Sequence, residues 1–269
     1  MDFKGISKQI RKDTLWTIGN LGVGHIGGSL SIIEVLVLLY YKYLNIDPSL
    51  PNKEGRDRLI VSKGHAGPAV YAVLANKGYF PKELLGTLNK NGTLLPSHCD
   101  MRLAGVDMTT GSLGQGFSCA VGIAKASKLS NDGAKIYSII GDGESQEGQI
   151  WEAAMFAGSH KLDNFIAILD KNNYQIDGAV DVINSIDPIG DKFKAFNFEV
   201  IEVKDGNDVD QIDEALSKAK EVKGKPTMLI LHTVKGKGVK SIENAGAGNH
   251  NMKYDLNKTA EFLKEVEEN

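Results

Sequence analysis

Four near-continuous apolar runs constrain the fold of this chain more than any other feature of its sequence. They lie at residues 135–140, 164–169, 198–203 and 227–231, and a shorter candidate strand lies at 58–61. Runs of this kind are typical of parallel strands that are covered on both faces. Helical patterns alternate with them, at residues 114–129, 151–159 and 209–221. The alternation predicts an α/β protein with an open, mostly parallel sheet and helices on both faces.

The chain reads as one domain across residues 1–269. No internal repeat, low-complexity run or flexible linker divides it. A helical pattern at 6–20 precedes the first strand, and a short helix is expected from about Asp255. The net charge of -3 provides no basic field, so we expect no nucleic-acid partner.

Composition and the N-terminus point to a cytoplasmic protein that is not attached to a membrane. The first residues lack the apolar core of a signal peptide. The longest apolar run, at 32–41, contains Glu34 and is too short to span a bilayer. Two cysteines, Cys99 and Cys119, without CxxC spacing favour a reducing compartment over a disulfide scaffold.

Polar, glycine-rich segments follow four of the five predicted strands. They are Ser62-Lys63-Gly64-His65, Gly141-Asp142-Gly143, Asp170-Lys171-Asn172-Asn173 and His232-Thr233-Val234-Lys235-Gly236. In open parallel sheets, ligands bind beyond the carboxyl ends of the strands. We therefore expect a functional site at this edge of the sheet.

One glycine pattern suggests a nucleotide site that the context does not support. Residues 22–27 match GxGxxG, the dinucleotide-binding fingerprint, which needs a preceding strand and a following helix. The preceding residues 6–20 have helical spacing instead. The segment is better interpreted as a flexible loop that carries His25 between two helices.

Gly141-Asp142-Gly143, paired with Asn172-Asn173 after the next strand, indicates a metal-diphosphate site. Mg²⁺ prefers oxygen ligands, and the sequence supplies them as the Asp142 carboxylate, the Asn172 amide and a backbone carbonyl near Tyr174. The flanking glycines let the backbone approach a phosphate group. Ca²⁺ or Mn²⁺ could occupy the same oxygen ligands. Taken alone, Gly141-Asp142-Gly143 would more often be an ordinary turn, and its pairing with Asn172-Asn173 is what favours the site.

Together the two motifs resemble the thiamine-diphosphate motif, and their neighbours are similar to the transketolase family in particular. The matching segments appear in the family's order over residues 7 to about 250. They are Val23-Gly24-His25, residues 59–66, residues 109–116 and residues 147–152.

The resemblance implies a role for each residue at a motif position. The implied metal ligands are Asp142, Asn172 and the carbonyl of Tyr174. The implied contacts to thiamine diphosphate are His65, Gly111, Ser112, Leu113, Gly141, Gly143, Glu144, Ile176 and His250, with the backbone of 111–113 beside the aminopyrimidine. His25 and His98 would face the substrate and, with His65, donate or accept protons. Glu147 and Glu152 would be the paired acids that connect two active sites across a dimer.

Three positions depart from the pattern of the family. Ile26 follows His25 where many members have proline, and Asn251 follows His250 where glycine is usual. Isoleucine at position 26 would make the loop at His25 less rigid, whereas Asn251 and the small residues at 245–248 bear on the contact implied for His250. Ser112 replaces a proline common in full-length members, and serine here resembles the split, two-chain branch of the family.

The resemblance also implies that half of the active site lies elsewhere. In the family, the glutamate beside the cofactor's pyrimidine ring belongs to a pyrimidine-binding domain, which this chain has no room for after its last helix. We therefore expect the N-terminal subunit of a split transketolase, which transfers a two-carbon ketol unit between sugar phosphates. Its partner would be a separate C-terminal subunit, in a heterodimer or, by analogy, a heterotetramer.

Three alternatives remain open from the sequence. The chain could belong to a deoxyxylulose-phosphate synthase-like enzyme or be the α subunit of a 2-oxo-acid dehydrogenase, since both share the metal motif. A non-catalytic diphosphate-binding module is the third alternative. The segments at 62–66 and 109–116 favour transketolase over the dehydrogenase more clearly than over the synthase.

Overall fold

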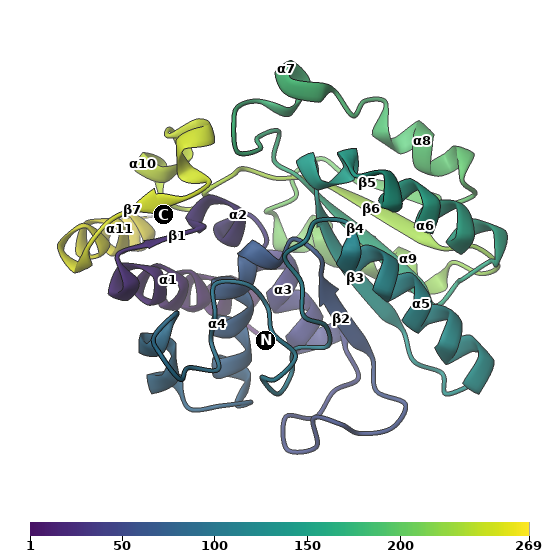
Figure 1. Cartoon of the computed structure of the whole chain (residues 1–269), viewed down its shortest axis with the longest axis horizontal. Coiled ribbons are helices and arrows are strands. Elements are labelled where there is room, and N and C mark those ends of the chain that lie inside the picture. The colour runs from purple at the N-terminus through teal and green to yellow at the C-terminus, as the bar shows by residue number, and fades with distance from the viewer. Residues whose placement is uncertain (269) are drawn as a thin grey trace.

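A five-stranded parallel sheet forms the centre of the molecule, which a computed structural model describes for residues 1–268 (Figure 1). The strand order is β2-β3-β4-β6-β5, and every neighbouring pair is parallel. The strands are β2 (Arg58–Val61), β3 (Ile136–Gly141), β4 (Phe165–Lys171), β5 (Glu199–Val203) and β6 (Thr227–His232). The predicted α/β class and all five predicted strands are confirmed. Residue 269, the end of the predicted domain, lies outside the described residues.

Helices flank the sheet on both sides, as predicted. They are α1 (Phe3–Leu21), α2 (Ile26–Leu30), α3 (Ile33–Leu38), α4 (Gly67–Lys77), α5 (Gln115–Ser130), α6 (Gly148–Ser159), α7 (Val180–Asn184), α8 (Ile189–Ala195), α9 (Val209–Glu221), α10 (Lys240–Glu243) and α11 (Leu256–Glu268). A π-helical turn at Leu39–Tyr43 accompanies 3₁₀ turns at Gly64–Ala66, Lys82–Thr87, Gly143–Gln146 and Gly246–Asn249. Helix α9 begins and ends where the sequence predicted, and α6 begins three residues before the predicted position 151.

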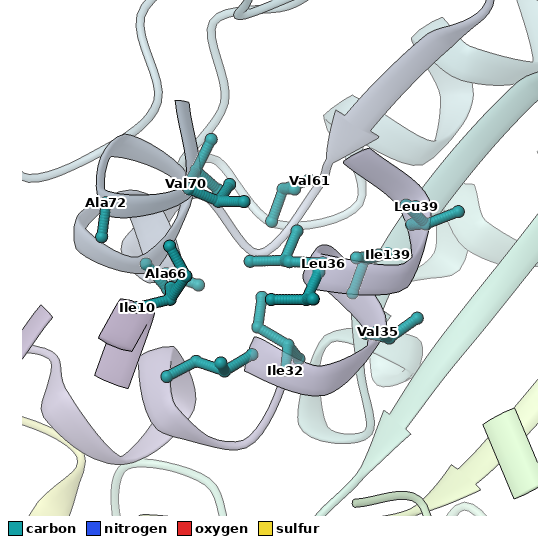
Figure 2. Packing of buried hydrophobic residues seen from close by; sticks show 14 of the residues in the cluster. Ile10, Ile32, Val35, Leu36, Leu39, Val61, Ala66, Val70, Ala72 and Ile139 are labelled. Atoms are coloured by element: carbon teal, nitrogen blue, oxygen red, sulfur yellow. The ribbon is translucent and has the colours of Figure 1, made fainter. Parts of the chain in front are cut away.

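Alternate residues of each strand enter two separate hydrophobic cores. Val61 and Ile139 pack with α1, α3 and α4 on one face of the sheet, where Figure 2 shows them beside Leu36 and Val70. Ile140, the residue after Ile139, packs on the other face with α5, α6 and α8. This alternation follows from the two-residue period of a strand. It explains why the central strands are apolar at nearly every position.

Strand β5 is covered less completely than the central strands, although α9 packs with Ile201 and Val203 on one face and α8 packs with Val200 on the other. It lies at one edge of the sheet, and Val203 is the one of its five residues that is fully buried. Glu199 and Glu202 lie on it and carry charges that the sheet interior would not accommodate. The prediction that residues 198–203 form a strand covered on both faces is confirmed, and the coverage of this strand is incomplete.

A second, two-stranded sheet joins the N-terminal and C-terminal parts of the chain. β1 (Val23–Gly24) pairs antiparallel with β7 (Met252–Lys253), and Gly24 lies opposite Met252. Gly22 ends α1 in the left-handed conformation, so a helix and not a strand precedes the GxGxxG pattern. The missing strand context confirms the argument against a dinucleotide site. His25 lies between α1 and α2, as predicted, and a short paired strand, β1, precedes it where a flexible loop was predicted. Among the described residues, no helix combines the length and the apolar character that crossing a membrane requires.

Candidate active site

The segments that follow β2, β3, β4 and β6 meet at one edge of the sheet beside a cavity of about 300 Å³. These four strands are consecutive in the sheet, so their carboxyl ends lie side by side. The cavity is lined by His25, Gly28, Lys63, His65, His98, Gly111, Leu113, Gly141, Asp142, Gly143, Glu144, Gln146, Glu147, Asn172, Tyr174, Gln175, Ile176, Asp177, Lys235 and His250. Of the residues predicted for the site, Ser112 and Glu152 do not line it.

The predicted metal ligands leave the sheet next to each other. Gly141 pairs with Asp170 in the parallel register, so Asp142 and Asn172 follow from adjacent strand ends. The Asp142 carboxylate accepts the N–H groups of Gly143 and Asn173. Burial, followed by the nearby Asp170, raises the pKa of Asp142 to about 6. A buried carboxylate beside another acid is well placed to gain from a cation.

The donor set fits a hard divalent cation. It consists of a carboxylate, an amide oxygen and the Tyr174 carbonyl, and oxygen ligands of this kind suit Mg²⁺. In the described part of the chain, no cluster of three or more His, Cys, Asp or Glu side chains could hold a metal ion by itself. The site therefore fits a cation shared between the protein and a diphosphate better than a closed protein cage.

Beneath these ligands lies a buried acid that the sequence motifs did not single out. Asp170 is fully buried, and its carboxylate pairs with Lys63 and accepts hydrogen bonds from three more side chains. The three donors are Ser31, Asn172 and Thr233. The Asn172 NH₂ group donates to Asp170 at 2.9 Å, and its amide oxygen accepts the Tyr174 N–H at 3.2 Å with a second lone pair left for a cation. Burial opposes ionisation of Asp170, but the Lys63 ammonium lowers its pKa overall.

Glu144 was predicted to contact the cofactor, and its carboxylate is engaged by the protein itself. It is 3% exposed and accepts from the Ser62 hydroxyl and from the N–H groups of Gly114 and Gly141. Burial raises the pKa of Glu144, against these donors. The residue borders the cavity, and whether it touches a cofactor stays a prediction.

Four histidines converge on the cavity from different parts of the chain. The ring centroid of His25 lies 5.4 Å from that of His65, 5.5 Å from His98 and 5.3 Å from His250. His65 and His250 are 5.1 Å apart. The pairing of β1 with β7 explains the contact between His25 and His250, since each histidine flanks this small sheet. The other two histidines, His160 and His232, do not line the cavity.

All four of these imidazoles favour the neutral form. Burial is the main cause, and it lowers the pKa of His25 to about 4, with further contributions from His98 and Lys235. Burial and then Lys235 lower the pKa of His250 to about 3. The pKa values of His65 and His98 are lowered as well, each mainly by burial. Neutral imidazole can both accept and donate a proton, as a proton-transfer site requires.

The glycine that begins the predicted pyrimidine-side backbone is required by its conformation. Gly111 has φ of +148°, and a Cβ there would lie 2.9 Å from the His98 ring. Leu113 faces the cavity next to it, whereas Ser112 does not line the cavity. A backbone contact by Ser112, as the resemblance implies, is not tested by its side-chain position.

Lys235 is a second residue that the sequence motifs did not select. Its side chain is buried and its ammonium donates to the Tyr174 carbonyl at 2.9 Å, 3.2 Å from His250 Nδ1. Burial and then Lys63 lower the pKa of Lys235 to about 8. Its position in the polar segment after β6 was a usable signal, because every such segment reaches this cavity.

The predicted acid pair lies at the outer rim. Glu147 lines the cavity and is exposed, and Glu152 is exposed on α6 without reaching the cavity. The exposed apolar side chains of Met155 and Phe156 lie on the same helix. The role of the acids between two active sites stays a prediction.

Comparison with known proteins places this geometry in a family. The family model described as "Transketolase, thiamine diphosphate binding domain" matches residues 4–261. The chain belongs to the transketolase family. The predicted fold and the resemblance to this family are thereby confirmed.

The relatives include transketolase subunits of similar length. The chain is 56% identical to a 6-deoxy-6-sulfo-D-fructose transketolase subunit of Clostridium sp. (strain MSTE9), over 94% of this chain and 92% of the relative. It is 37% identical to an apulose-4-phosphate transketolase subunit of Phocaeicola vulgatus, over 91% of this chain and 87% of the relative. These similarities confirm the prediction of a thiamine-diphosphate-binding transketolase subunit and do not favour the three alternatives.

Full-length transketolases match over less than half of their own length. The solved transketolase of Leishmania mexicana has a TM-score of 0.92 and 28% identity, over 99% of this chain and 41% of that chain. The transketolase of Campylobacter jejuni has a TM-score of 0.88 and 31% identity, over 98% and 46%. The chain is thus similar in structure to one portion of these longer enzymes.

Proposed function

We propose that this chain is the diphosphate- and metal-binding subunit of a split transketolase that transfers a two-carbon ketol unit from a ketose phosphate to an aldose phosphate. The observation that carries the proposal is the cavity where the oxygen ligands Asp142 and Asn172 meet four neutral histidines. The similarity to transketolase subunits of nearly the same length supports it. Residues 1–269 would form the diphosphate-binding domain.

Asp142, Asn172 and the Tyr174 carbonyl would hold Mg²⁺, with Ca²⁺ or Mn²⁺ as substitutes. Their position at adjacent strand ends supports this assignment. Lys235 would neutralise negative charge beside them, because its buried ammonium already contacts the Tyr174 carbonyl. The cation and the ammonium together suit a ligand with several negative charges, such as a diphosphate.

Thiamine diphosphate would lie along the cavity from this charged end to the segment at 111–113. When bound, it supplies a stabilised carbanion that the side chains of the protein cannot provide. Contacts are proposed for His65, Gly111, Ser112, Leu113, Gly141, Gly143, Glu144, Ile176 and His250. Ile176, which is exposed and lines the cavity, offers an apolar surface for a ring.

His25, His65 and His98 would move protons on the substrate side. Because burial keeps these imidazoles neutral, each can accept a proton from a sugar hydroxyl and return it to a carbonyl oxygen. His25 is central to the cluster, since its ring lies within 5.5 Å of three others.

A separate C-terminal subunit would supply the pyrimidine-binding domain and its glutamate. We propose a heterotetramer in which Glu147 and Glu152 connect two active sites. Their exposure at the rim of the cavity and on α6 supports a position at an interface between subunits. The cytoplasm is the proposed location, with the free thiols of Cys99 and Cys119 in support.

A second class of donor sugar is worth testing because of the relative at 56% identity. Its name identifies 6-deoxy-6-sulfo-D-fructose as its sugar, a ketose that carries a sulfonate in place of a phosphate. Both kinds of donor end in an anionic group remote from the carbonyl. We propose that the enzyme accepts an anionic ketose. Ketol-transfer assays with a ketose phosphate and with 6-deoxy-6-sulfo-D-fructose as donors would show which of the two donors it uses.

Purification of the tagged chain from its native cells, with thiamine diphosphate and Mg²⁺ in the buffer, tests the proposal directly. We expect a second chain of similar size that carries a pyrimidine-binding domain, and ketol transfer by the purified complex. Recovery of the chain alone, under conditions where it binds the cofactor, would contradict the split enzyme. If the complex with Asp142→Ala kept its ketol-transfer activity unchanged, the assignment of Asp142 to the active site would be wrong.

A further inference from the structure

Glu144 joins three segments of the candidate site that are far apart in the sequence. One carboxylate oxygen accepts the Ser62 hydroxyl and the Gly114 N–H at 2.9 Å. The other accepts the Gly141 N–H at 2.9 Å. Ser62 precedes Lys63, Gly114 follows Leu113, and Gly141 precedes Asp142. One buried side chain thus contacts the neighbours of residues on three walls of the cavity.

Glu144 supplies hydrogen bonds to the N-terminus of α5 directly and through Ser62, beside the bond from the Gln115 N–H to the Ser112 carbonyl. Its N-cap residue is Gly114, which has φ of +80° and no side chain to cap the helix. Glu144 accepts the Gly114 N–H directly, and Ser62 accepts the Phe117 N–H at 3.0 Å while donating to Glu144. A carboxylate at the positive end of this 16-residue helix is electrostatically favoured.

The same contacts connect the two ends of the proposed cofactor position. Gly114 is continuous with the segment at 111–113, and Gly141 is continuous with Asp142 and Gly143. In the described part of the chain, no other side chain hydrogen-bonds to both of these segments. A shift at Glu144 would therefore change the distance between the two ends without removing either.

We propose that Glu144 is a positioning residue that sets the register between the pyrimidine-side segment at 111–113 and the diphosphate segment at 141–143. This inference rests on the proposed function, because it assumes that one ligand spans both segments. A ligand bound at two points gains affinity from the second point only while the spacing is right. Glu144 therefore acts on cofactor affinity through the backbone that it holds.

Glu144→Gln in the complete complex tests the inference. The amide keeps the size of the side chain but presents an NH₂ group toward one of the N–H donors. We expect the Kd for thiamine diphosphate, measured by calorimetry with Mg²⁺, to rise about 10-fold or more, within the range for supporting residues of a metal site. The Kd for inorganic pyrophosphate with Mg²⁺ should rise by less than about 3-fold, because pyrophosphate occupies the diphosphate segment alone.

Asp57→Asn is the matched control. The Asp57 carboxylate is 7% exposed and accepts the N–H groups of Asn45 and Lys135, each at 2.8 Å, at the amino end of the sheet. Asp57→Asn should lower the melting temperature and leave the Kd values for thiamine diphosphate and for pyrophosphate unchanged. Such a result shows that loss of a buried carboxylate is not by itself enough to weaken the binding of thiamine diphosphate.

Equal weakening of both ligands by Glu144→Gln, or unchanged affinity for thiamine diphosphate, would overturn the inference. If Glu144→Gln does not fold, Ser62→Ala tests the inference instead, since it removes one of the three contacts of Glu144. It should weaken the binding of thiamine diphosphate more than the binding of pyrophosphate. Failure of the wild-type complex to bind thiamine diphosphate would instead refute the proposed function. The two failures are therefore distinguishable.

Discussion

The two ends of the parallel sheet both bury carboxylates, and they satisfy them in different ways. At the amino end, Asp57 accepts two backbone N–H groups, and Asp107 pairs with Arg56 and accepts the Leu59 N–H. At the carboxyl end, Asp142, Glu144 and Asp170 lie together with two buried lysines, Lys63 and Lys235. These charges come from strand ends that are distant in the sequence.

This difference indicates which end of the sheet is suited to bind a ligand. The amino-end acids connect backbone segments, Asp57 those at Asn45 and Lys135 and Asp107 that at Leu59, so their hydrogen bonds serve the fold. The carboxyl-end charges border a cavity of about 300 Å³, and burial shifts the pKa values of Asp142 and Lys235 away from their ordinary range. Perturbed groups gathered in a cavity are typical of functional sites. Substitutions at the two ends should therefore have different consequences.

Loss of the Lys63 ammonium should have the largest effect on folding. Lys63→Met leaves Asp170 buried without its cation, and we expect the free energy of unfolding to fall by about 3–5 kcal/mol. Urea unfolding of the purified chain measures it. Lys171→Met is the control, because its partner Asp187 is 44% exposed and a surface pair contributes less than about 1 kcal/mol. Equal losses in the two variants would contradict the distinction.

Loss of the Asp142 carboxylate should abolish cofactor binding and leave the fold intact. We expect Asp142→Ala to reduce Mg²⁺-dependent affinity for thiamine diphosphate by about 100-fold or more, because supporting residues alone contribute about 10–100-fold. Calorimetry and ketol-transfer assays of the complex measure the effect. Asp57→Asn, at the other end of the sheet, should change neither. A similar loss in both variants would mean that the two ends are not distinct.

The histidine cluster should make stability depend on pH. His25 and His250 have folded pKa values of about 4 and about 3, below the ordinary 6.5, so the unfolded chain binds more protons. Stability should therefore rise with pH between about 4 and 6.5. Asp142, Glu144 and Asp57 oppose this trend, because burial raises the pKa of each and favours protonation in the folded state. The four cavity histidines, all with lowered pKa values, outnumber these three acids.

Melting temperatures of the cofactor-free chain from pH 5 to 7 check the sign of this slope. His250→Asn should flatten the slope, because it removes one group that must lose its proton on folding. His160→Asn is the control, since His160 is exposed and lies outside the cavity. A slope that is unchanged in His250→Asn would show that the buried cluster does not determine the pH dependence.

The rim acids should have the smallest effect on the chain itself. Glu152 is exposed on α6, so Glu152→Gln should change the free energy of unfolding by no more than about 0.5 kcal/mol. If Glu152 connects two active sites, cofactor titrations of the complex should change in shape. Glu214→Gln, in an exposed pair with Lys218, provides the control. An effect of equal size in both complexes would remove the proposed link.

Much of the fold could be predicted because the patterns that encode it are local. The apolar runs at 135–140 and 164–169 span single strands, and the helical periodicity at 209–221 matches α9 to the residue. Strand β5 shows where a local pattern stops being informative. Its composition predicts a strand, and Glu199 and Glu202 indicate exposure, but which strand lies beside it depends on sheet order, which no single residue encodes.

The candidate site likewise has features that local sequence patterns predict and features that only the tertiary structure determines. The sequence by itself determined that Asp142 and Asn172, whose side chains carry oxygen atoms, follow two consecutive strands of the chain, because a short motif and a strand period suffice for that. Tertiary structure decided that β1 pairs with β7 and so joins His25 to His250, that Lys63 neutralises Asp170, and that Lys235 reaches Tyr174. These contacts join residues far apart in the chain, and the packing of the whole domain sets their geometry. No local sequence pattern could therefore predict them.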